Sequence, residues 1–182
     1  MEKRLLATVA ALLSACAPHA GDIEIRMSLN DIFEIKNNPD WTITVDRYMP
    51  LRLADISIIS KKGYDFDLKL YFKCDTKDLA RFDTREKALK SVLDSSKPYL
   101  PYCVEKAIAP KPLKVKRFGF YAVLTDKKLA KAEKTPPGEY KYMTRGLYRT
   151  ADDSVLGFSL MTNDIDSKDY EKLLEYILAF EK

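Results

Sequence analysis

Residues 64–74, with the sequence YDFDLKLYFKC, alternate apolar and polar side chains with a period of two. Successive side chains of an extended chain point to opposite sides, so the two kinds separate. The apolar members on one side are Phe66, Leu68, Leu70 and Phe72. The charged members on the other side are Asp65, Asp67, Lys69 and Lys73. The stretch therefore predicts a β-strand of an antiparallel sheet, with one buried face and one polar face.

Two further strands are predicted before this one. Residues 54–60, ADISIIS, are expected to form a strand, and the turn Lys61-Lys62-Gly63 joins it to residues 64–74, which indicates a β-hairpin. Residues 41–45, WTITV, alternate large apolar residues with threonine. This pattern predicts a strand with Trp41 on its buried face.

The second half of the chain predicts more strands of the same kind. Residues 113–125 are expected to form one long strand, in which Gly119 marks a β-bulge or a close approach of another segment. Residues 139–150 and 154–162 predict a second hairpin, joined across Ala151-Asp152-Asp153. Hairpins of this kind again imply an antiparallel sheet.

Two amphipathic segments predict helices. The first is capped by Asp83 or Thr84 and extends to about Ser95. Its expected buried residues are Ala88, Leu89, Val92 and Leu93. The second follows a cap at Asp166 or Ser167, and its apolar stripe is Tyr170, Leu173, Leu174, Ile177 and Leu178. The sequence thus predicts an α+β fold, an antiparallel β-sheet flanked by helices.

Several of these stretches occur in a familiar combination. They are Trp41 at the start of a strand, Phe118-Gly119-Phe120-Tyr121-Ala122, Glu139-Tyr140-Lys141-Tyr142 leading to residues 158–164, and the closing helix. Together they resemble the Mog/PsbP-like family in pattern, over residues 40–182. The resemblance implies an α-β-α sandwich around an antiparallel sheet. It implies no particular ligand, because members of that family bind different partners.

The N-terminus has the pattern of a bacterial secretory signal. Lys3-Arg4 precedes an apolar run over residues 5–15, which is too short to span a bilayer permanently. The stretch Leu13-Ser14-Ala15-Cys16 resembles the lipobox of bacterial lipoproteins. The resemblance implies a signal peptide over residues 1–15 and acylation, palmitate included, of Cys16 as the first mature residue. An ordinary cleaved signal without a lipid is the alternative.

The leader also suggests the domain plan and the location. Residues 16–38 are expected to form a lipid-anchored linker, and residues 39–182 a single globular α+β domain. Within the linker, residues 23–25 and 32–33 fit either short strands or a helical turn. Ala17 is not the aspartate that retains some lipoproteins in the inner membrane. We therefore expect a cell-envelope protein, anchored by its N-terminal lipid to the outer membrane and facing the periplasm.

The charge of the chain is mild. Its 182 residues carry a formal net charge of +4, spread along the length. The one local basic cluster comprises Lys111, Lys114, Lys116 and Arg117. It lacks the arginine-rich or glycine-aromatic patterning of nucleic-acid modules, so no nucleic-acid partner is expected. A solvated strand edge, where lysines discourage edge-to-edge pairing, is the favoured interpretation.

Two cysteines, Cys74 and Cys103, follow the expected lipidation site. In an oxidising compartment this pair predicts a disulfide that closes a loop of about thirty residues. A redox-active pair is the alternative, although the Cys-x-x-Cys spacing typical of such pairs is missing.

The sequence contains few candidate catalytic residues. The only histidine is His19, so residues 39–182 have no imidazole. That excludes Ser-His-Asp catalysis, Cys-His catalysis and ordinary zinc sites there, and no glycine-rich phosphate loop is present. We therefore expect no catalytic residue, no metal and no cofactor. Paired carboxylates can hydrolyse glycans without histidine, so a carboxylate-dependent envelope hydrolase is the alternative. Its candidate pairs are Asp65 with Asp67 and Asp152 with Asp153.

Tyrosines give the remaining candidate for a binding surface. Tyr140, Tyr142 and Tyr148 lie at even spacing on one predicted hairpin, near Arg145. An open face of this kind would bind an apolar or glycan-like small ligand, or an envelope protein. The alternative is ordinary sheet core beneath a helix. The function expected from the sequence is therefore a non-catalytic binding or accessory role in the envelope.

Overall fold

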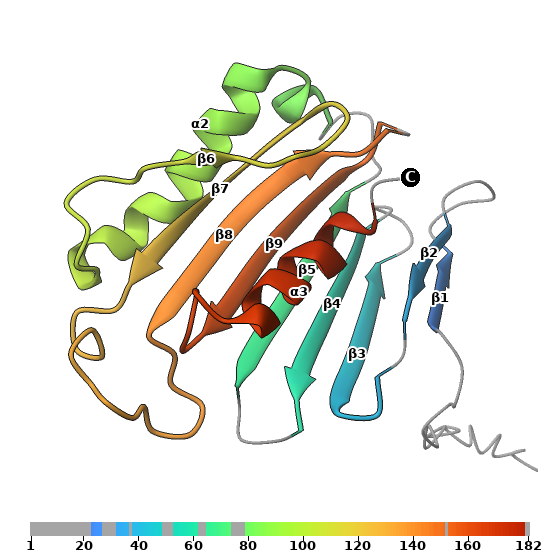
Figure 1. Ribbon diagram of the computed structural model, residues 1–182. Helices are drawn as coiled ribbons and strands as arrows, with labels where there is room; N and C mark the ends of the chain where they lie inside the picture. The colour runs from blue at the N-terminus through green and yellow to red at the C-terminus, as the bar shows by residue number, and fades with distance from the viewer. Residues whose placement is uncertain are drawn as a thin grey trace, which may run out of the picture.

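The computed structural model describes residues 23–26, 32–36, 38–48, 53–61, 65–73, 79–151 and 153–180 (Figure 1). Its main element is a seven-stranded sheet in the order β3-β4-β5-β9-β8-β7-β6, with every neighbouring pair antiparallel. The strands of this sheet are β3 (Trp41–Tyr48), β4 (Leu53–Ser60), β5 (Phe66–Lys73), β6 (Lys111–Pro112), β7 (Phe118–Thr125), β8 (Tyr142–Arg149) and β9 (Val155–Thr162). A separate sheet pairs β1 (Ile23–Arg26) with β2 (Ile32–Ile35). The helices are α2 (Arg85–Ser96) and α3 (Lys168–Leu178), and 3-10 turns form η2 (Ala80–Phe82) and η3 (Lys97–Tyr102).

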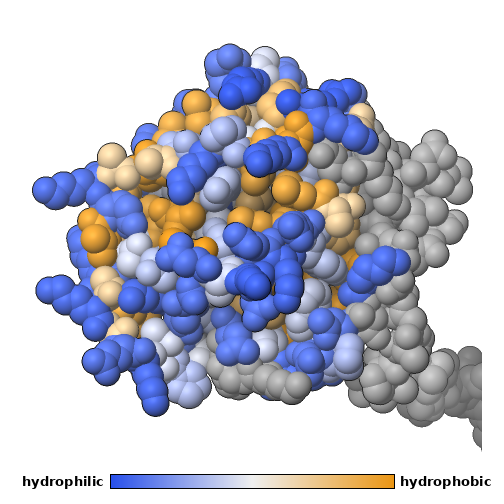
Figure 2. All heavy atoms as spheres, viewed as in Figure 1, coloured by the Kyte–Doolittle hydropathy of each residue, from blue (hydrophilic) through white to orange (hydrophobic). Residues whose placement is uncertain are grey.

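One face of the sheet packs against α3, which lies across the middle of the sheet in Figure 1. The predicted alternation of β5 is confirmed, because its four apolar residues are buried on this face: Phe66, Leu68, Leu70 and Phe72. The predicted stripe of α3 meets them, with Tyr170, Leu173 and Ile177 buried and Leu174 and Leu178 half-buried. The outer side of α3 carries hydrophilic side chains, which cover the centre of this surface (Figure 2).

Two tyrosine hydroxyls tie α3 to β8 inside this core. Tyr148 is fully buried and donates a hydrogen bond to the carbonyl oxygen of Ile177, with an oxygen–oxygen distance of 2.7 Å. The hydroxyls of Thr144 and Tyr170 lie 2.8 Å apart. Buried polar groups are tolerated where each finds a partner, and each partner lies on one particular residue of the other element. The two bonds therefore fix where α3 sits along β8.

The opposite face packs against α2, but only over β7 and β8. The cross-strand partners Phe120 and Leu147 lie on this side and are buried against Ala88 and Val92 of α2. The Arg85 guanidinium lies 5.0 Å from the centroid of the Phe120 ring, where its charge meets the negative ring face. The two helices therefore cover opposite faces of one antiparallel sheet. The predicted α+β class, with a sheet flanked by helices, is confirmed.

The helix caps resolve the choices left open by the sequence. Thr84, not Asp83, caps α2, since its side chain accepts a hydrogen bond from the Lys87 amide. Ser167, not Asp166, caps α3, accepting from the Tyr170 amide. Each cap satisfies a backbone donor that has no partner in the first turn of its helix.

The single strand predicted over residues 113–125 is wrong in its first part. The structure has a short edge strand β6 and then β7, with a turn between them. The Leu113 amide donates to the carbonyl oxygen of Gly119 at 2.9 Å, so the chain folds back on itself instead of continuing. Leu113 and Val115 lie in this turn and both pack on the core. Their apolar side chains therefore produce the alternating pattern that is typical of a strand, although the residues are not in one. The basic side chains of this edge are exposed, as predicted: Lys111, Lys114, Lys116 and Arg117.

The region predicted as a linker contributes to the core. Residues 16–38 include β1 and β2, and the Ile35 side chain is fully buried in the cluster beneath α3. The short strands left open for residues 23–25 and 32–33 are present as this pair. The packed body therefore includes at least Ile35, which precedes the boundary expected at residue 39.

Two glycines on neighbouring central strands have different reasons to be glycine. A Cβ on Gly146 of β8 would overlap the Phe158 ring and come within 2.8 Å of the Phe120 carbonyl oxygen. A Cβ on Gly157 of β9 would meet nothing closer than Tyr71 Cβ, at 3.8 Å, which is ordinary contact. A third, Gly119, faces Tyr148 so closely that a Cβ would overlap it, which confirms the close approach predicted there.

We therefore expect opposite effects from two matched alanine substitutions. Gly146→Ala overpacks the core and should lower the free energy of unfolding by about 2 kcal/mol or more. Gly157→Ala should leave it unchanged or raise it by up to about 1 kcal/mol, because glycine is a poor strand residue. Urea unfolding followed by circular dichroism measures both. Equal destabilisation by the two substitutions would contradict this account of the sheet.

Candidate functional site

The face of the sheet opposite α3 is only partly covered by α2. Beside α2, the strands β5, β9 and β8 present a row of polar side chains at one level of the sheet. Cross-strand pairing places Lys69 of β5 opposite Ser159 of β9, and Ser159 opposite Arg145 of β8. The next level contains Tyr71, Gly157 and Leu147, paired in the same way. This uncovered strip is where the structure is hollowed.

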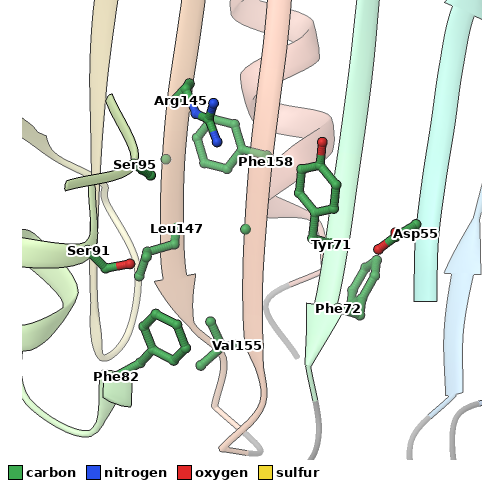
Figure 3. Close-up of a pocket in the computed structure, with 12 residues that line it drawn as sticks. Asp55, Tyr71, Phe72, Phe82, Ser91, Ser95, Arg145, Leu147, Val155 and Phe158 are labelled. Atoms are coloured by element: carbon green, nitrogen blue, oxygen red, sulfur yellow. The ribbon is translucent and has the colours of Figure 1, made fainter. Parts of the chain in front are cut away.

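The first cavity on the strip has a volume of about 440 Å³ and lies between α2 and the sheet. Its two ends differ in chemistry. Figure 3 shows Arg145 and Tyr71 at one end and Phe82 and Val155 at the other. Its lining also includes Ser91 and Ser95 of α2, Leu147 of β8, Gly157 of β9 and the carboxylate of Asp55 of β4. Apolar walls with a few convergent polar groups are typical of small-molecule sites.

Gly157 keeps this cavity open at its floor. Its missing side chain would point to the α2 side of the sheet, as those of its cross-strand partners Tyr71 and Leu147 do. The space above it is empty enough for a Cβ, as described for Gly157 above. No packing constraint within the described contacts of Gly157 requires glycine there, in contrast to Gly146.

A second cavity of about 340 Å³ adjoins the first, and Tyr71 and Arg145 line both. Its remaining lining is more polar and includes Asp67, Lys69, Ser159, Tyr99, Tyr140, Met143 and Met161. The two cavities thus form one groove with an apolar chamber and a polar chamber. We call these the α2 chamber, for the first cavity, and the polar chamber, for the second.

Arg145 stands at the junction of the chambers with unused hydrogen-bonding capacity. The residue is half-buried, and its guanidinium lies 5.0 Å from the centroid of the Tyr99 ring. Among the described residues it makes no ion pair and no hydrogen bond to a side chain or backbone group. A guanidinium has five N–H donors in a planar fork that suits carboxylate and similar anions. The stacking on Tyr99 holds that fork in place without using it.

Tyr71 and Asp67 add a donor and an acceptor to the groove. Burial raises the pKa of Tyr71, and the positive charge of Arg145 partly opposes that rise, so the phenol stays protonated at neutral pH and can donate. Asp67 Oδ1 is buried and has no hydrogen-bond partner among the residues that the structure describes. A buried acceptor without a donor is rare in proteins, so Asp67 marks the polar chamber as a place where the packing of the chain leaves a polar atom unused.

The tyrosine surface predicted from the sequence does not exist as a unit. Tyr148 lies fully buried under α3, and Tyr142 shares that face, with Lys141 Nζ 5.7 Å from its ring centroid. Tyr140 and Arg145 instead line the polar chamber. The even spacing predicted a shared face for the three tyrosines, but β8 begins only at Tyr142. The alternation of the strand therefore does not extend back to Tyr140.

The predicted carboxylate pairs are not brought together as two free carboxylates across a cleft. Asp65 is exposed, with Oδ2 3.5 Å from the Ser60 hydroxyl, while Asp67 faces the polar chamber. Asp153 forms ion pairs with Arg117 and Arg149. Asp152 lies outside the described residues.

Sequence reasoning missed most of the groove. Gly157, Tyr71, Lys69 and Ser159 were not among the expected site residues. The available signal was Gly157, because a glycine inside a strand pattern marks a close approach or an opening. The lipidation site Cys16 and the histidine His19 lie outside the described residues.

The arrangement of the strands weighs against the predicted disulfide. Cys103 is buried and free, and it pairs with Asp126, next to the Thr125 end of β7. Cys74 lies outside the described residues, and the last described residue before it, Lys73, pairs with Val155 at the other end of the sheet. Seven residues of strand separate the two ends of β7, about 23 Å, whereas a disulfide needs Cα atoms within about 7 Å.

We therefore expect two free thiols in a Cys16→Ser form of the chain. Ellman's reagent should titrate both after unfolding in urea without reductant. In the folded protein Cys103 should react slowly at pH 8, because burial raises its pKa and the nearby Glu105 and Asp126 add to the rise, so less thiolate is present. A Cys74→Ser form isolates the Cys103 signal. Zero thiols in unfolded protein would restore the disulfide.

Comparison of the chain with protein-family models, curated proteins and solved structures finds no match. Within the described ranges no helix is long and apolar enough to cross a membrane. The same part of the chain contains no group of three or more His, Cys, Asp or Glu residues placed to hold a metal ion.

Proposed function

We propose that this chain is an exported, lipid-anchored envelope protein with a non-catalytic binding role. Its ligand site is the groove formed by the α2 chamber and the polar chamber. The observation that carries the proposal is Gly157, whose missing side chain leaves the floor of the α2 chamber open.

Glycine at position 157 has a cost in stability. A glycine in the interior of a central strand weakens the sheet, since it loses backbone entropy and packs no side chain. At Gly146 and Gly119 neighbouring groups fill the space and explain the residue. At Gly157 the space stays empty and borders a cavity with polar groups at one end. A residue that lowers stability, and that no contact with its neighbours explains, is expected at a functional site.

The fold proposal goes with this role. We propose that residues 40–182 form a Mog/PsbP-like domain, an α-β-α sandwich. It is supported by α2 and α3 lying on opposite faces of an antiparallel sheet. In such an arrangement a sheet face beside a helix is available for binding, and the ligand differs from one protein to another.

The anchor proposal rests on the leader. Acyl chains on Cys16, at about 0.8 kcal/mol per buried methylene, would hold the body at a membrane surface. The groove, with chambers of about 440 and 340 Å³, favours a small ligand over a protein partner. An accessory role in an envelope complex is the alternative within the same class.

Binding in the groove can be tested with N-phenyl-1-naphthylamine, an uncharged dye that fluoresces in apolar sites. The dye should bind a single class of sites, and Gly157→Val should weaken that binding by about tenfold because the valine fills the α2 chamber. Thr42→Val is the matched control, since Thr42 is exposed on β3 and lines neither chamber. Equal binding by all three proteins would overturn the groove as a site.

Anchoring can be tested by labelling with radioactive palmitate in a bacterium that processes lipoproteins. The unaltered chain should take up label and fractionate with membranes, because the Cys16 thiol is the expected acceptor. Cys16→Ser should lose the label and remain unprocessed, while Cys74→Ser should keep it. An unlabelled wild-type chain would remove the lipid anchor from the proposal and leave the binding role standing.

A further inference from the structure

We infer that the groove takes a small amphipathic organic monoanion. Its carboxylate or sulfonate head lies in the row formed by Lys69, Ser159 and Arg145, and its ring or short chain lies in the α2 chamber over Gly157. The inference rests on the proposed binding role and names the chemistry of the ligand.

The first step concerns the donors at one level of the sheet. Three adjacent strands each contribute one: the Lys69 ammonium, the Ser159 hydroxyl and the Arg145 guanidinium. All three side chains line the polar chamber. Adjacent strands lie about 4.8 Å apart, so an oxyanion placed above the middle strand is within reach of both flanking cations.

The second step concerns Arg145 itself. A half-buried guanidinium loses part of its hydration and gains from a paired anion, and charge-assisted bonds of this kind are the strong ones. Arg117 and Arg149 both have an aspartate partner, Asp153, whereas Arg145 has only the Tyr99 ring among the described residues. The missing partner of Arg145 is therefore an acid group of the ligand.

The third step limits the charge of that head group. Lys69 and Arg145 bring two positive charges to the groove, and Asp55 and Asp67 bring two negative charges at its borders. The four charges cancel over the whole groove, and the positive charge is local to Lys69 and Arg145, which flank Ser159. A head with a single negative charge pairs with these two cations and meets limited repulsion from the two aspartates. A doubly charged phosphate monoester would meet more of it.

The fourth step concerns size. The α2 chamber, of about 440 Å³, has the size of a site for one ring system or one short chain, not for a phospholipid with two long chains. Phe82, Leu147 and Val155 line it away from Arg145. The polar head and the apolar body of one ligand thus meet the two ends seen in Figure 3.

The test uses a matched pair of dyes on the full chain. 1-Anilinonaphthalene-8-sulfonate is N-phenyl-1-naphthylamine with one added sulfonate, so the two differ by the anionic head. Arg145→Gln should raise the dissociation constant of the sulfonate dye by about tenfold and leave that of the neutral dye within about twofold. Lys69→Gln should act in the same direction by a smaller factor, since Lys69 is exposed.

Arg85→Gln is the control, because Arg85 also stacks on an aromatic ring but lines neither chamber. It should change neither dye. Ser91→Leu, which fills the α2 chamber from the helix, should weaken both dyes and stands in for Gly157→Val if that protein does not fold. Decanoate, the free carboxylate, should displace the neutral dye at lower concentration than decanol, and Arg145→Gln should abolish the difference.

The outcomes separate this inference from the binding role. If the neutral dye binds and Ser91→Leu or Gly157→Val weakens it, the groove is a site. If Arg145→Gln then affects the two dyes equally, or decanol displaces as well as decanoate does, the ligand is not an anion held by Arg145. If neither filling substitution weakens the neutral dye, the groove itself fails as the site.

Discussion

The width of a helix decides where the sheet of this protein is left hollow. A helix with its side chains is about 10 Å across, and strands lie about 4.8 Å apart, so one helix covers about two strands. On the face that carries Phe120 and Leu147, α2 lies over β7 and β8, and the short turns η2 and η3 flank it. No helix of the described residues lies above the neighbouring strip of β9 and β5, and the groove forms along the step between covered and uncovered sheet. The rest of the site follows from which residues the register brings to that step.

The other face makes the floor of the groove stiff. Tyr148 and Tyr170 bind across the junction of β8 and α3, and Phe158 fills the space above Gly146. Strands held on one side by fixed hydrogen bonds and close packing present their opposite side chains in a constant geometry. The backbone positions of Lys69, Ser159 and Arg145 are therefore fixed relative to one another, which would lower the cost of ordering their side chains around a ligand.

Most of the fold could be predicted from local patterns, and the site could not. The alternation in residues 64–74 gave β5 with the correct face inward, and the stripe from Tyr170 to Leu178 gave the buried side of α3. Such patterns report burial residue by residue. They do not report pairing between distant strands, and Arg145, Ser159 and Lys69 meet only because β8, β9 and β5 are neighbours. The same limit explains the tyrosines, since the face on which Tyr140 lies depends on where β8 begins. The turn before β7 depends on a hydrogen bond from the Leu113 amide to the Gly119 carbonyl oxygen, and the periodicity of apolar residues in the sequence does not predict that bond.

The two central glycines have different structural roles, and only the packing around each glycine distinguishes these roles. Gly146 and Gly157 lie on adjacent strands, each in the interior of a predicted strand. At Gly146 the Phe158 ring and the Phe120 carbonyl oxygen occupy the space that a side chain would need, so the core requires glycine there. At Gly157 the corresponding space is empty. It lies beside the guanidinium of Arg145, which no described acidic side chain neutralises. An empty position and an unpaired charge each reduce stability. Because they border the same hollow, one ligand with an apolar body and an acidic head would compensate for both costs at once.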